Sequence, residues 1–303
     1  MATAPIEPPQ RLVSSLSGDP DRRVREWLQA LPTLVQQHLD AWELTLERVQ
    51  VPGGRSSLLA LVRQGDGTPA ALKLPAPGRS SAQEAAALEA WDGWGAARLL
   101  RYDGTSGALL LERLQSAVSL RSLPEAKALL EAAGTVRRLW VAPTPGHPFE
   151  TVAGRTEEAT QLLRTAGALT RAAGPLVEEA LELRRDLPAG SEEEFLLHGA
   201  FRQGKVLGGE RAPWLAVGPA PVVGERAYDL AALVLDRFED VMAGSGAGAA
   251  ARRRVGRLAD SLEVDRDRLR DWTLYRAVDT GVREVAGGDR QRGELLLEFA
   301  AWL

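Results

Sequence analysis

The hydrophobic pattern of the first part of the chain changes period twice. Residues 19–42 place apolar side chains at helical spacing, and Pro32 is expected to kink or split that helix. Residues 45–75 instead alternate between Gly- and Pro-containing breaks, which predicts three antiparallel strands. An Ala-rich helix over residues 80–95 and two strands within residues 97–114 follow, so this part is mainly a small sheet.

From about residue 119 onward, the apolar spacing is mostly helical. The first ten residues are expected to be a flexible lead-in, and residues 243–250 a short flexible break. Strands followed by helices argue for an α+β protein with a small sheet lobe, residues 1–115, and a larger helical lobe, residues 116–303. The predicted helices of the second lobe cover residues 122–140, 156–174, 175–187, 225–242, 252–262, 265–287 and 292–303.

Composition narrows the class of protein. A hydrophobic fraction of 45% and a mean hydropathy of −0.17 are typical of a globular chain. The net charge of −4 provides no general attraction for nucleic acid or an anionic membrane, and no apolar run reaches the length of about 18 residues that spans a bilayer. The start lacks the pattern of a secretion signal, so we expect a cytoplasmic protein. Zero cysteines exclude disulfides and thiolate chemistry.

Lysine is rare in this chain, which has three lysines among 37 basic residues. Lys73 lies in an apolar run, Ala-Ala-Leu-Lys-Leu, where an unpaired ammonium would be costly to bury. We therefore expect an anionic partner, best placed at Glu84 in the following helix. A surface lysine on an edge strand is the alternative.

Two further segments have features of a nucleotide site. Gly53 and Gly54 permit a tight turn and a close backbone approach to phosphates, with the hydroxyls of Ser56 and Ser57 nearby. An ordinary hairpin turn would explain the same residues. The backbone around Glu112 could bind a purine edge, although side chains do not report on that role.

The order of these segments resembles the aminoglycoside and hydroxyurea phosphotransferases, a bacterial branch of the protein-kinase-like fold, over roughly residues 20–300. The resemblance rests on "VPGGRSSLLALV", "AALKL", "QEAAALEAWDGWGAARLLRYD", "ALLLERL" and "WLAVGPAPVVGERAYDLAALVLDR". It implies a two-lobe fold and ATP as the phosphoryl donor. It also implies that Lys73 grips phosphate, that Glu84 pairs with it, and that Glu112 lies at the hinge beside the adenine.

The same resemblance identifies a loop that has lost its chemical groups. The family pattern is His-Gly-Asp-Leu-His-x-x-Asn followed by a strand that ends Ile-Asp-Pro; the first Asp acts on the acceptor hydroxyl, and the Asn and second Asp hold Mg²⁺. In this chain the base position is Ala200, and the metal-ligand positions are Lys205 and Gly218. His198 and Asp229 remain, in structural roles, since the acid is expected to brace the loop through its backbone amides.

These replacements predict a pseudokinase. A positioned base contributes about 10²–10⁴-fold in rate, and the metal contributes several kcal/mol more. The formal charge of the loop changes from −2 to +2 when Arg202 and Lys205 are counted, which disfavours Mg²⁺ and favours an anion. We expect a nucleotide or another anionic small molecule without Mg²⁺, with Lys73 and Lys205 facing one cleft. Relaxed drift after loss of function is the alternative explanation of these charges.

Other functions stay open at this stage. An active phosphotransferase that acts on an antibiotic or secondary metabolite would need carboxylates recruited from elsewhere, for example Glu210 or Glu225. A transferase that moves another group has no positive support. The acidic runs 192–194 and 238–240 are candidates for recognising a cationic small molecule, although such runs are usually solvated faces. A protein partner is also open.

Overall fold

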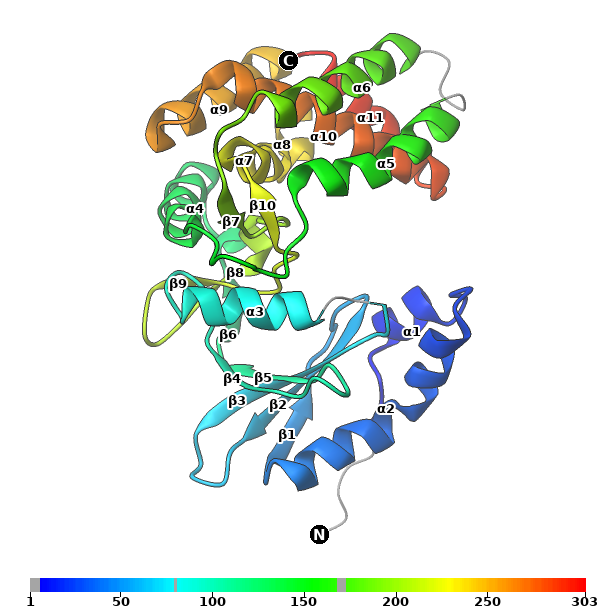
Figure 1. The fold of residues 1–303 in the computed structure, drawn as a ribbon, viewed down its shortest axis with the longest axis vertical. Coiled ribbons are helices and arrows are strands. Elements are labelled where there is room, and N and C mark those ends of the chain that lie inside the picture. The colour runs from blue at the N-terminus through cyan, green and yellow to red at the C-terminus, as the bar shows by residue number, and fades with distance from the viewer. Residues whose placement is uncertain (1–5, 79–80, 168–172) are drawn as a thin grey trace. The chain divides into compact units, whose positions relative to one another are not determined.

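The computed structural model describes residues 6–78, 81–167 and 173–303, and the chain divides into two compact units (Figure 1). The N-terminal unit comprises Met1–Gln115 together with the loop Gly209–Pro213. The C-terminal unit comprises Ser116–Gly208 and Trp214–Leu303. The loop 209–213 therefore packs with the sheet-containing unit, although sequence analysis placed it in the helical lobe.

The N-terminal unit is built on a five-stranded antiparallel sheet in the order β1-β2-β3-β5-β4. The predicted strands of this region are confirmed, including the three-stranded antiparallel run. Apolar side chains fill the central strands, because both faces of those strands are largely covered. The strands are β1 Thr45–Val49, β2 Ser57–Arg63, β3 Pro69–Pro75, β4 Leu99–Tyr102 and β5 Leu109–Glu112.

Three helices belong to the same unit: α1 Gln10–Leu16, α2 Arg22–Ala41 and α3 Ser81–Trp91. The first two share one apolar core with β2, β3 and β5, through residues such as Leu12 and Leu31. Helix α1 follows directly on the expected lead-in of residues 1–10, and no helix was predicted there. Pro32 does not split the next helix, because α2 continues through it. Burial of the α2 face that carries Leu31 offsets the hydrogen bond that a proline removes.

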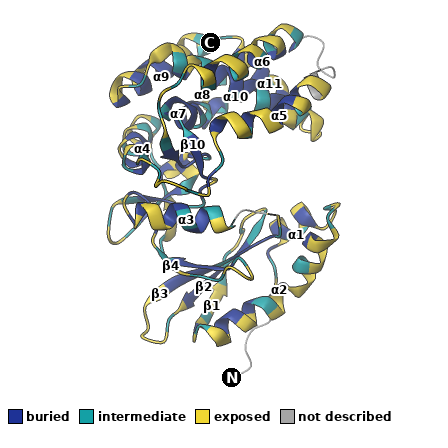
Figure 2. Cartoon of the chain, viewed as in Figure 1, coloured by how far each residue is buried: buried dark blue, intermediate teal, exposed yellow. Residues whose placement is uncertain are grey.

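The C-terminal unit is mainly helical, and α10 lies at its centre. This helix packs against α5, α6, α7, α9 and α11. Trp272 and Tyr275 are among the residues that it buries, and Figure 2 colours the chain by burial. Of the predicted helix 156–174, residues 168–172 lie outside the described residues. The helices are α4 Glu125–Leu139, α5 Val152–Gly167, α6 Gly174–Ala189, α7 Arg226–Leu235, α8 Phe238–Met242, α9 Ala247–Leu262, α10 Arg266–Ala286 and α11 Arg290–Ala300, with 3₁₀ turns η1 Leu120–Ser122 and η3 Gln203–Lys205.

The predicted continuous helix 225–242 is interrupted. Asp236 is extended and Arg237 is left-handed, with φ of 55°, so the segment forms α7 and α8. The buried carboxylate of Asp236 accepts a hydrogen bond from the backbone N–H of Gln203 at 2.6 Å, a contact made across 33 positions of sequence. The break at 243–250 is also shorter than predicted, because α9 begins at Ala247. Tertiary contacts thus override the local helical pattern.

Short strands position the loop that sequence analysis singled out. β7 Phe195–Leu197 pairs with β10 Val222–Gly224, and the order of the second small sheet is β6-β8-β9. The loop with His198 connects β7 to β8, and Gly218 follows β9. The strands of that second sheet are β6 Gln115–Ser119, β8 Val206–Gly208 and β9 Trp214–Ala216.

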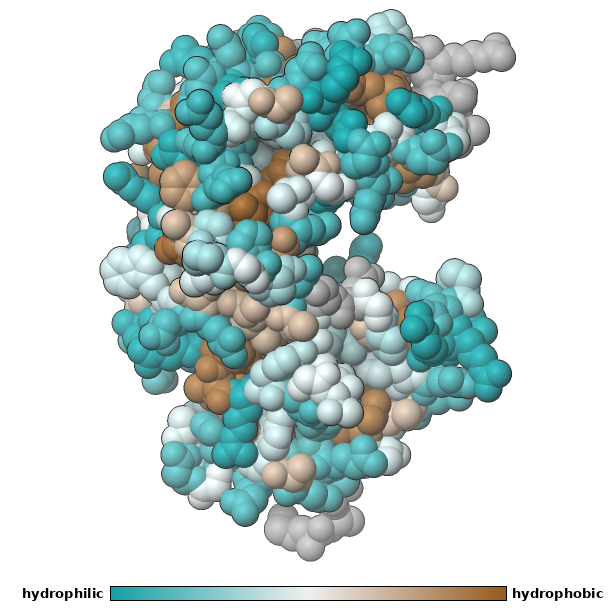
Figure 3. Space-filling view, in the orientation of Figure 1, coloured by the Kyte–Doolittle hydropathy of each residue, from teal (hydrophilic) through white to brown (hydrophobic). Residues whose placement is uncertain are grey.

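The surface is mostly hydrophilic on the face drawn in Figure 3, and apolar residues form small patches there. Among the described residues, no helix is long and apolar enough to cross a membrane. The large apolar side chains that the described residues expose are Val51, Trp94, Leu100, Val118 and Leu130.

The residue that ends α9 has a left-handed backbone conformation that should reduce stability. Glu263 has φ 53° and ψ 46°, a conformation in which a side chain costs about 1–2 kcal/mol relative to glycine. Glu263→Gly is expected to raise the free energy of unfolding by about 0.5–1 kcal/mol in urea denaturation. Glu263→Ala removes the same charge and keeps the Cβ, so it should give no gain in stability. Equal effects of the two variants would show that the backbone conformation is not the cause.

Candidate functional site

The predicted ion pair of the N-terminal unit is present. β3 carries Lys73 and α3 carries Glu84, and the ammonium donates to the two carboxylate oxygens at 2.7 and 2.5 Å. The side chains of Lys73 and Glu84 are only 16% and 8% exposed. The charge of the lysine is therefore neutralised by a carboxylate inside the unit, as its apolar surroundings led us to expect. The surface-lysine alternative is therefore wrong.

The Gly-containing turn between β1 and β2 is held by the N-terminal segment. Gly53 has φ of 72°, and a Cβ there would come within 2.9 Å of Cγ of the buried Pro9. A Cβ on Gly54 would lie 3.1 Å from the carbonyl oxygen of Ser57, and the Ser56 carbonyl accepts the Ala76 N–H at 2.9 Å. Gly53 and Gly54 form the tight turn that the sequence predicted. The contact of this turn with Pro9 was not predicted.

Glu112 ends β5 and is occupied within its own unit. Its carboxylate accepts the Arg98 backbone N–H at 3.0 Å and the Arg211 guanidinium at 2.9 Å. Arg211, on the loop 209–213, also donates to the carbonyl oxygens of Gly93 and Ala96 at 2.7 and 3.1 Å. The Glu112 side chain is thus committed, which agrees with assigning any purine contact to the backbone. No sequence signal identified Arg211, since its partners lie about a hundred positions away.

The loop after β7 is braced by a buried acid, as predicted. The Asp229 carboxylate, on α7, accepts the backbone N–H groups of His198 and Gly199 at 3.0 and 2.9 Å. Burial raises the pKa of Asp229, and the two N–H donors and the charge of Arg276 oppose that rise. The Asp229 side chain is fully buried, so it is not a residue of the protein surface.

His198 is a structural histidine. Its ring is buried, and its Nε2 lies 3.2 Å from the carbonyl oxygen of Val217. Burial, followed by the positive charge of Lys205, lowers the pKa of His198 to about 3. The imidazole is therefore neutral at pH 7, which suits a hydrogen-bonded brace.

Lys205 and Gly218, which occupy the metal-ligand positions implied by the resemblance, form a hydrogen bond with each other. The Lys205 ammonium donates to the carbonyl oxygen of Gly218 at 2.7 Å. The base position, Ala200, has only a methyl group as its side chain. Mg²⁺ requires oxygen ligands in octahedral geometry, and an ammonium supplies positive charge and hydrogen-bond donors instead. The residues present do not fit a magnesium ion.

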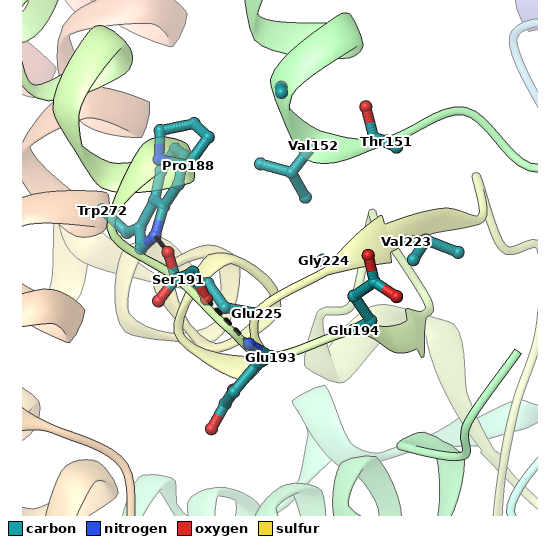
Figure 4. Close-up of a pocket in the computed structure, with 11 residues that line it drawn as sticks. Thr151, Val152, Pro188, Ser191, Glu193, Glu194, Val223, Gly224, Glu225 and Trp272 are labelled. Carbon is teal, nitrogen blue, oxygen red and sulfur yellow. Dashed lines mark hydrogen bonds between the residues drawn. The ribbon is translucent and has the colours of Figure 1, made fainter.

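Residues 6–78, 81–167 and 173–303 contain no group of three or more His, Cys, Asp or Glu that could hold a metal ion. The suggestion that Glu225 is recruited is wrong, because its buried carboxylate accepts from Arg268 at 2.6 Å and from the Trp272 indole at 2.5 Å (Figure 4). Glu210 is exposed, on the loop that packs with the N-terminal unit.

Arginines that the sequence did not predict also hold this region. Arg155, on α5, donates to the carbonyl oxygens of Ala220 and Pro221 at 2.7 and 2.8 Å. Arg276, on α10, donates to the Gly199 carbonyl at 3.4 Å. Arg202 itself is exposed at the start of η3. Arg155 and Arg276 thus hold the backbone of this region, and the sequence contained no sign of these contacts because the partners are distant along the chain.

Gln203 is a second missed residue. Its side chain is fully buried, yet neither amide atom has a hydrogen-bond partner among the described residues. An unsatisfied buried polar group costs about 1–3 kcal/mol. The backbone of this turn is well anchored, whereas its buried side chain is a source of instability.

The solved structures of other proteins define the class. The chain has a TM-score of 0.61 with an aminoglycoside phosphotransferase solved with ADP and hygromycin B, at 14% identity, covering 88% of this chain and 96% of that one. A choline kinase from Streptococcus pneumoniae gives a TM-score of 0.62 at 12% identity, covering 90% and 99%. The fold is therefore the protein-kinase-like fold of small-molecule kinases.

Sequence relatives narrow the class to a family. The chain is 32% identical over 287 residues to a streptomycin 6-kinase of Streptomyces glaucescens, covering 93% of this chain and 92% of the relative. It is 36% identical over 275 residues to a hydroxyurea phosphotransferase of Kitasatospora aureofaciens, covering 88% and 76%. Residues 41–288 match the family described as aminoglycoside/hydroxyurea antibiotic resistance kinase. The chain belongs to this family.

The close approach at Gly199 predicts a severe effect of a small substitution. A Cβ at this residue, which has φ of 72°, would lie 1.9 Å from the Ala220 carbonyl oxygen. Gly199→Ala is expected to lower the free energy of unfolding by about 3 kcal/mol or more, measured by urea denaturation. Gly204→Ala is the matched control, because nothing lies within 4 Å of its Cβ position; a Gly199 variant as stable as this control would contradict the geometry.

The buried histidine predicts a pH dependence. The pKa of His198 is about 3 in the folded chain, against 6.5 for an ordinary histidine, so below pH 6.5 the unfolded chain binds the extra proton and stability falls. Between pH 7 and 5 this group should remove about 2 kcal/mol.

His198→Gln keeps an N–H donor and removes the titration, so its free energy of unfolding should fall less steeply over that pH range. The raised pKa of Asp229 acts in the opposite direction in both proteins and cancels in the comparison. Identical pH slopes in urea denaturation would contradict the assignment.

Proposed function

We propose that this chain is a catalytically degenerate member of its family that binds a nucleotide or another phosphate-bearing anion without Mg²⁺. The observation that carries the proposal is the 2.7 Å hydrogen bond from the Lys205 ammonium to the Gly218 carbonyl oxygen. It places a fixed positive charge between the two positions where the family resemblance implies metal ligands. The ammonium supplies locally the charge that a metal would bring.

The rate argument supports loss of phosphoryl transfer. Ala200 cannot accept a proton from an acceptor hydroxyl, which forgoes about 10²–10⁴ in rate. Loss of the metal forgoes several kcal/mol more, and each 1.36 kcal/mol is about tenfold. Together the two losses cost on the order of 10⁵ or more, after allowance for non-additive effects.

The remaining charges support an anion as the ligand. In the N-terminal unit, Lys73 is held by Glu84 in the geometry that a phosphate-gripping lysine requires. In the C-terminal unit, Lys205 is half-buried and Arg202 is exposed on the same turn, with no acid at Ala200 or Gly218 to oppose them. A loop with a net positive charge attracts phosphate and repels a divalent cation.

An active phosphotransferase is the second candidate, because the relatives with 32–36% identity are described as kinases or phosphotransferases. Its substrate would come from the class those names give, antibiotics or hydroxyurea. Magnesium-dependent ATP consumption by the purified protein in the presence of streptomycin or hydroxyurea would support this candidate and contradict ours.

Calorimetric titration with ADP tests the metal independence. We expect the same Kd in EDTA and in excess Mg²⁺, and a Kd about tenfold weaker for Lys205→Ala, since a charge-assisted hydrogen bond contributes about 1.5–3 kcal/mol. Lys127→Ala, an exposed lysine on α4, is the matched control and should bind as wild type. Absence of ADP, ATP and phosphate binding in EDTA would overturn the proposal.

Restoring the missing groups provides the complementary test. Gly218 has φ of 61°, which aspartate tolerates better than most residues, and its Cβ position meets only Lys205 Cε, at 4.0 Å. The triple variant Ala200→Asp, Lys205→Asn, Gly218→Asp is expected to bind ADP at least about tenfold more tightly with Mg²⁺ than with EDTA. No gain from Mg²⁺ would mean that the frame no longer supports a metal–nucleotide site.

A further inference from the structure

The segment before α1 packs against the glycine turn between β1 and β2, within the N-terminal unit. A Cβ placed on Gly53 would lie 2.9 Å from Pro9 Cγ and 3.0 Å from Pro9 Cβ, so the proline ring lies directly against the glycine backbone. Pro9 is buried, and it immediately precedes the first turn of α1. The start of the chain therefore touches the turn that the proposed function assigns to the phosphate groups of a nucleotide.

The helix that follows Pro9 holds it in place. The Pro9 carbonyl oxygen accepts the backbone N–H groups of Leu12 and Val13 at 2.9 and 3.1 Å. Leu12 and Leu16 are 0% and 5% exposed, and they belong to one apolar core with β2, β3 and β5. The proline is thus anchored to the sheet by contacts that do not involve the turn.

Helices α1 and α3 lie on opposite faces of the sheet. Leu72 and Leu74 share the apolar core with α1, whereas Lys73 between them bonds to Glu84 on α3. Successive residues of a strand point to opposite faces, so α1 covers the face away from the lysine. Pro9, which leads into α1, is therefore attached to the side of the sheet that does not carry the Lys73 side chain.

The middle of the turn has few restraints of its own. Among the described residues, no hydrogen bond uses the backbone N–H groups of Gly53, Gly54 or Arg55. Gly53 has φ of 72°, a conformation that glycine leaves readily when nothing holds it. A segment with few hydrogen bonds depends on its neighbours for a fixed position. The contact with Pro9 supplies such a restraint and leaves the N–H groups available to a ligand.

We propose that Pro9 is a positioning residue for nucleotide binding, whose ring holds the glycine turn in the conformation that receives phosphate. The inference rests on the proposed function, because it concerns the same nucleotide site. A turn that is already restrained loses less conformational entropy when a ligand binds, and the affinity rises accordingly. Pro9 acts through the turn, so its effect is on the affinity for ligands that carry phosphate.

Replacement of Pro9 tests this role. Pro9→Gly removes the ring and should weaken ADP binding in EDTA about tenfold, as measured by calorimetry. Adenosine lacks phosphate groups, and its affinity should be the same for Pro9→Gly and wild type. Pro9→Val keeps an apolar side chain against Gly53 and should bind ADP nearly as wild type does.

Pro8→Gly is the matched control for the added freedom of the chain. It gives the unfolded chain the same extra conformations as Pro9→Gly, and Pro8 is not among the groups nearest to Gly53. It should bind ADP as wild type. Leu12 and Leu16 are unchanged in every variant, so we expect each unit to fold, which urea denaturation checks.

NMR order parameters measure the restraint without any ligand. The backbone amides of Gly53 and Gly54 should fall from about 0.8 in wild type to below about 0.6 in Pro9→Gly. Gly67 is the internal control, because it lies between β2 and β3 with nothing within 4 Å of its Cβ position. Its order parameter should not change.

Unchanged order parameters at Gly53 and Gly54, or an ADP Kd that is equal in wild type and Pro9→Gly, would overturn this inference and leave the proposed function standing. An equal loss of affinity for ADP and adenosine would also overturn it, because the effect would then not depend on phosphate. Absence of ADP binding by wild type would instead overturn the proposed function, and the role of Pro9 in binding with it.

Discussion

A lysine ammonium donates to a backbone carbonyl at the position where related kinases are expected to hold a metal, and the functional interpretation depends on this contact. Lys205 and Gly218 are 13 positions apart, and their hydrogen bond of 2.7 Å joins the turn η3 to the end of β9. The interaction is local to the C-terminal unit. A fixed ammonium is compatible with phosphate and incompatible with a divalent cation, so one contact accounts for both the expected ligand and the expected loss of catalysis.

The scaffold around this contact is held by buried groups that form hydrogen bonds with the backbone. Asp229 binds two successive backbone amides, and the neutral ring of His198 meets the Val217 carbonyl. Gly199 leaves no room for a side chain against Ala220. These interactions depend on burial and backbone geometry and involve no carboxylate at Ala200 or Gly218. They would therefore hold the loop in the catalytically degenerate protein that we propose.

Several features were readable from sequence because they are local. The alternation over residues 45–75 predicted β1–β3, and the lone lysine in an apolar run predicted the Lys73–Glu84 pair. Asp229 was predicted through the family pattern, which encodes its distance from the loop. Features that depend on distant partners were not predicted: the stop at Arg237, and the contacts of Arg211 and Arg155.

The charges of the acidic run 192–194 are another feature that the sequence leaves undetermined. The acidic run 192–194 was visible in the sequence, but the run does not reveal which of its charges is neutralised. Only the positions of Arg226 and Arg268 separate the compensated Glu193 and Glu225 from Glu194. Which of these charges are paired after folding is thus a property of tertiary structure.

The central claim, that a lysine replaces the metal, is tested most directly by crystals grown with ADP and Mn²⁺ and measured for anomalous scattering from manganese. The account predicts nucleotide density with no manganese peak within coordination distance of Gly218, and the Lys205 ammonium on its carbonyl oxygen or on a phosphate oxygen. A manganese ion bound between the nucleotide phosphates and the protein, with Lys205 displaced, would contradict it.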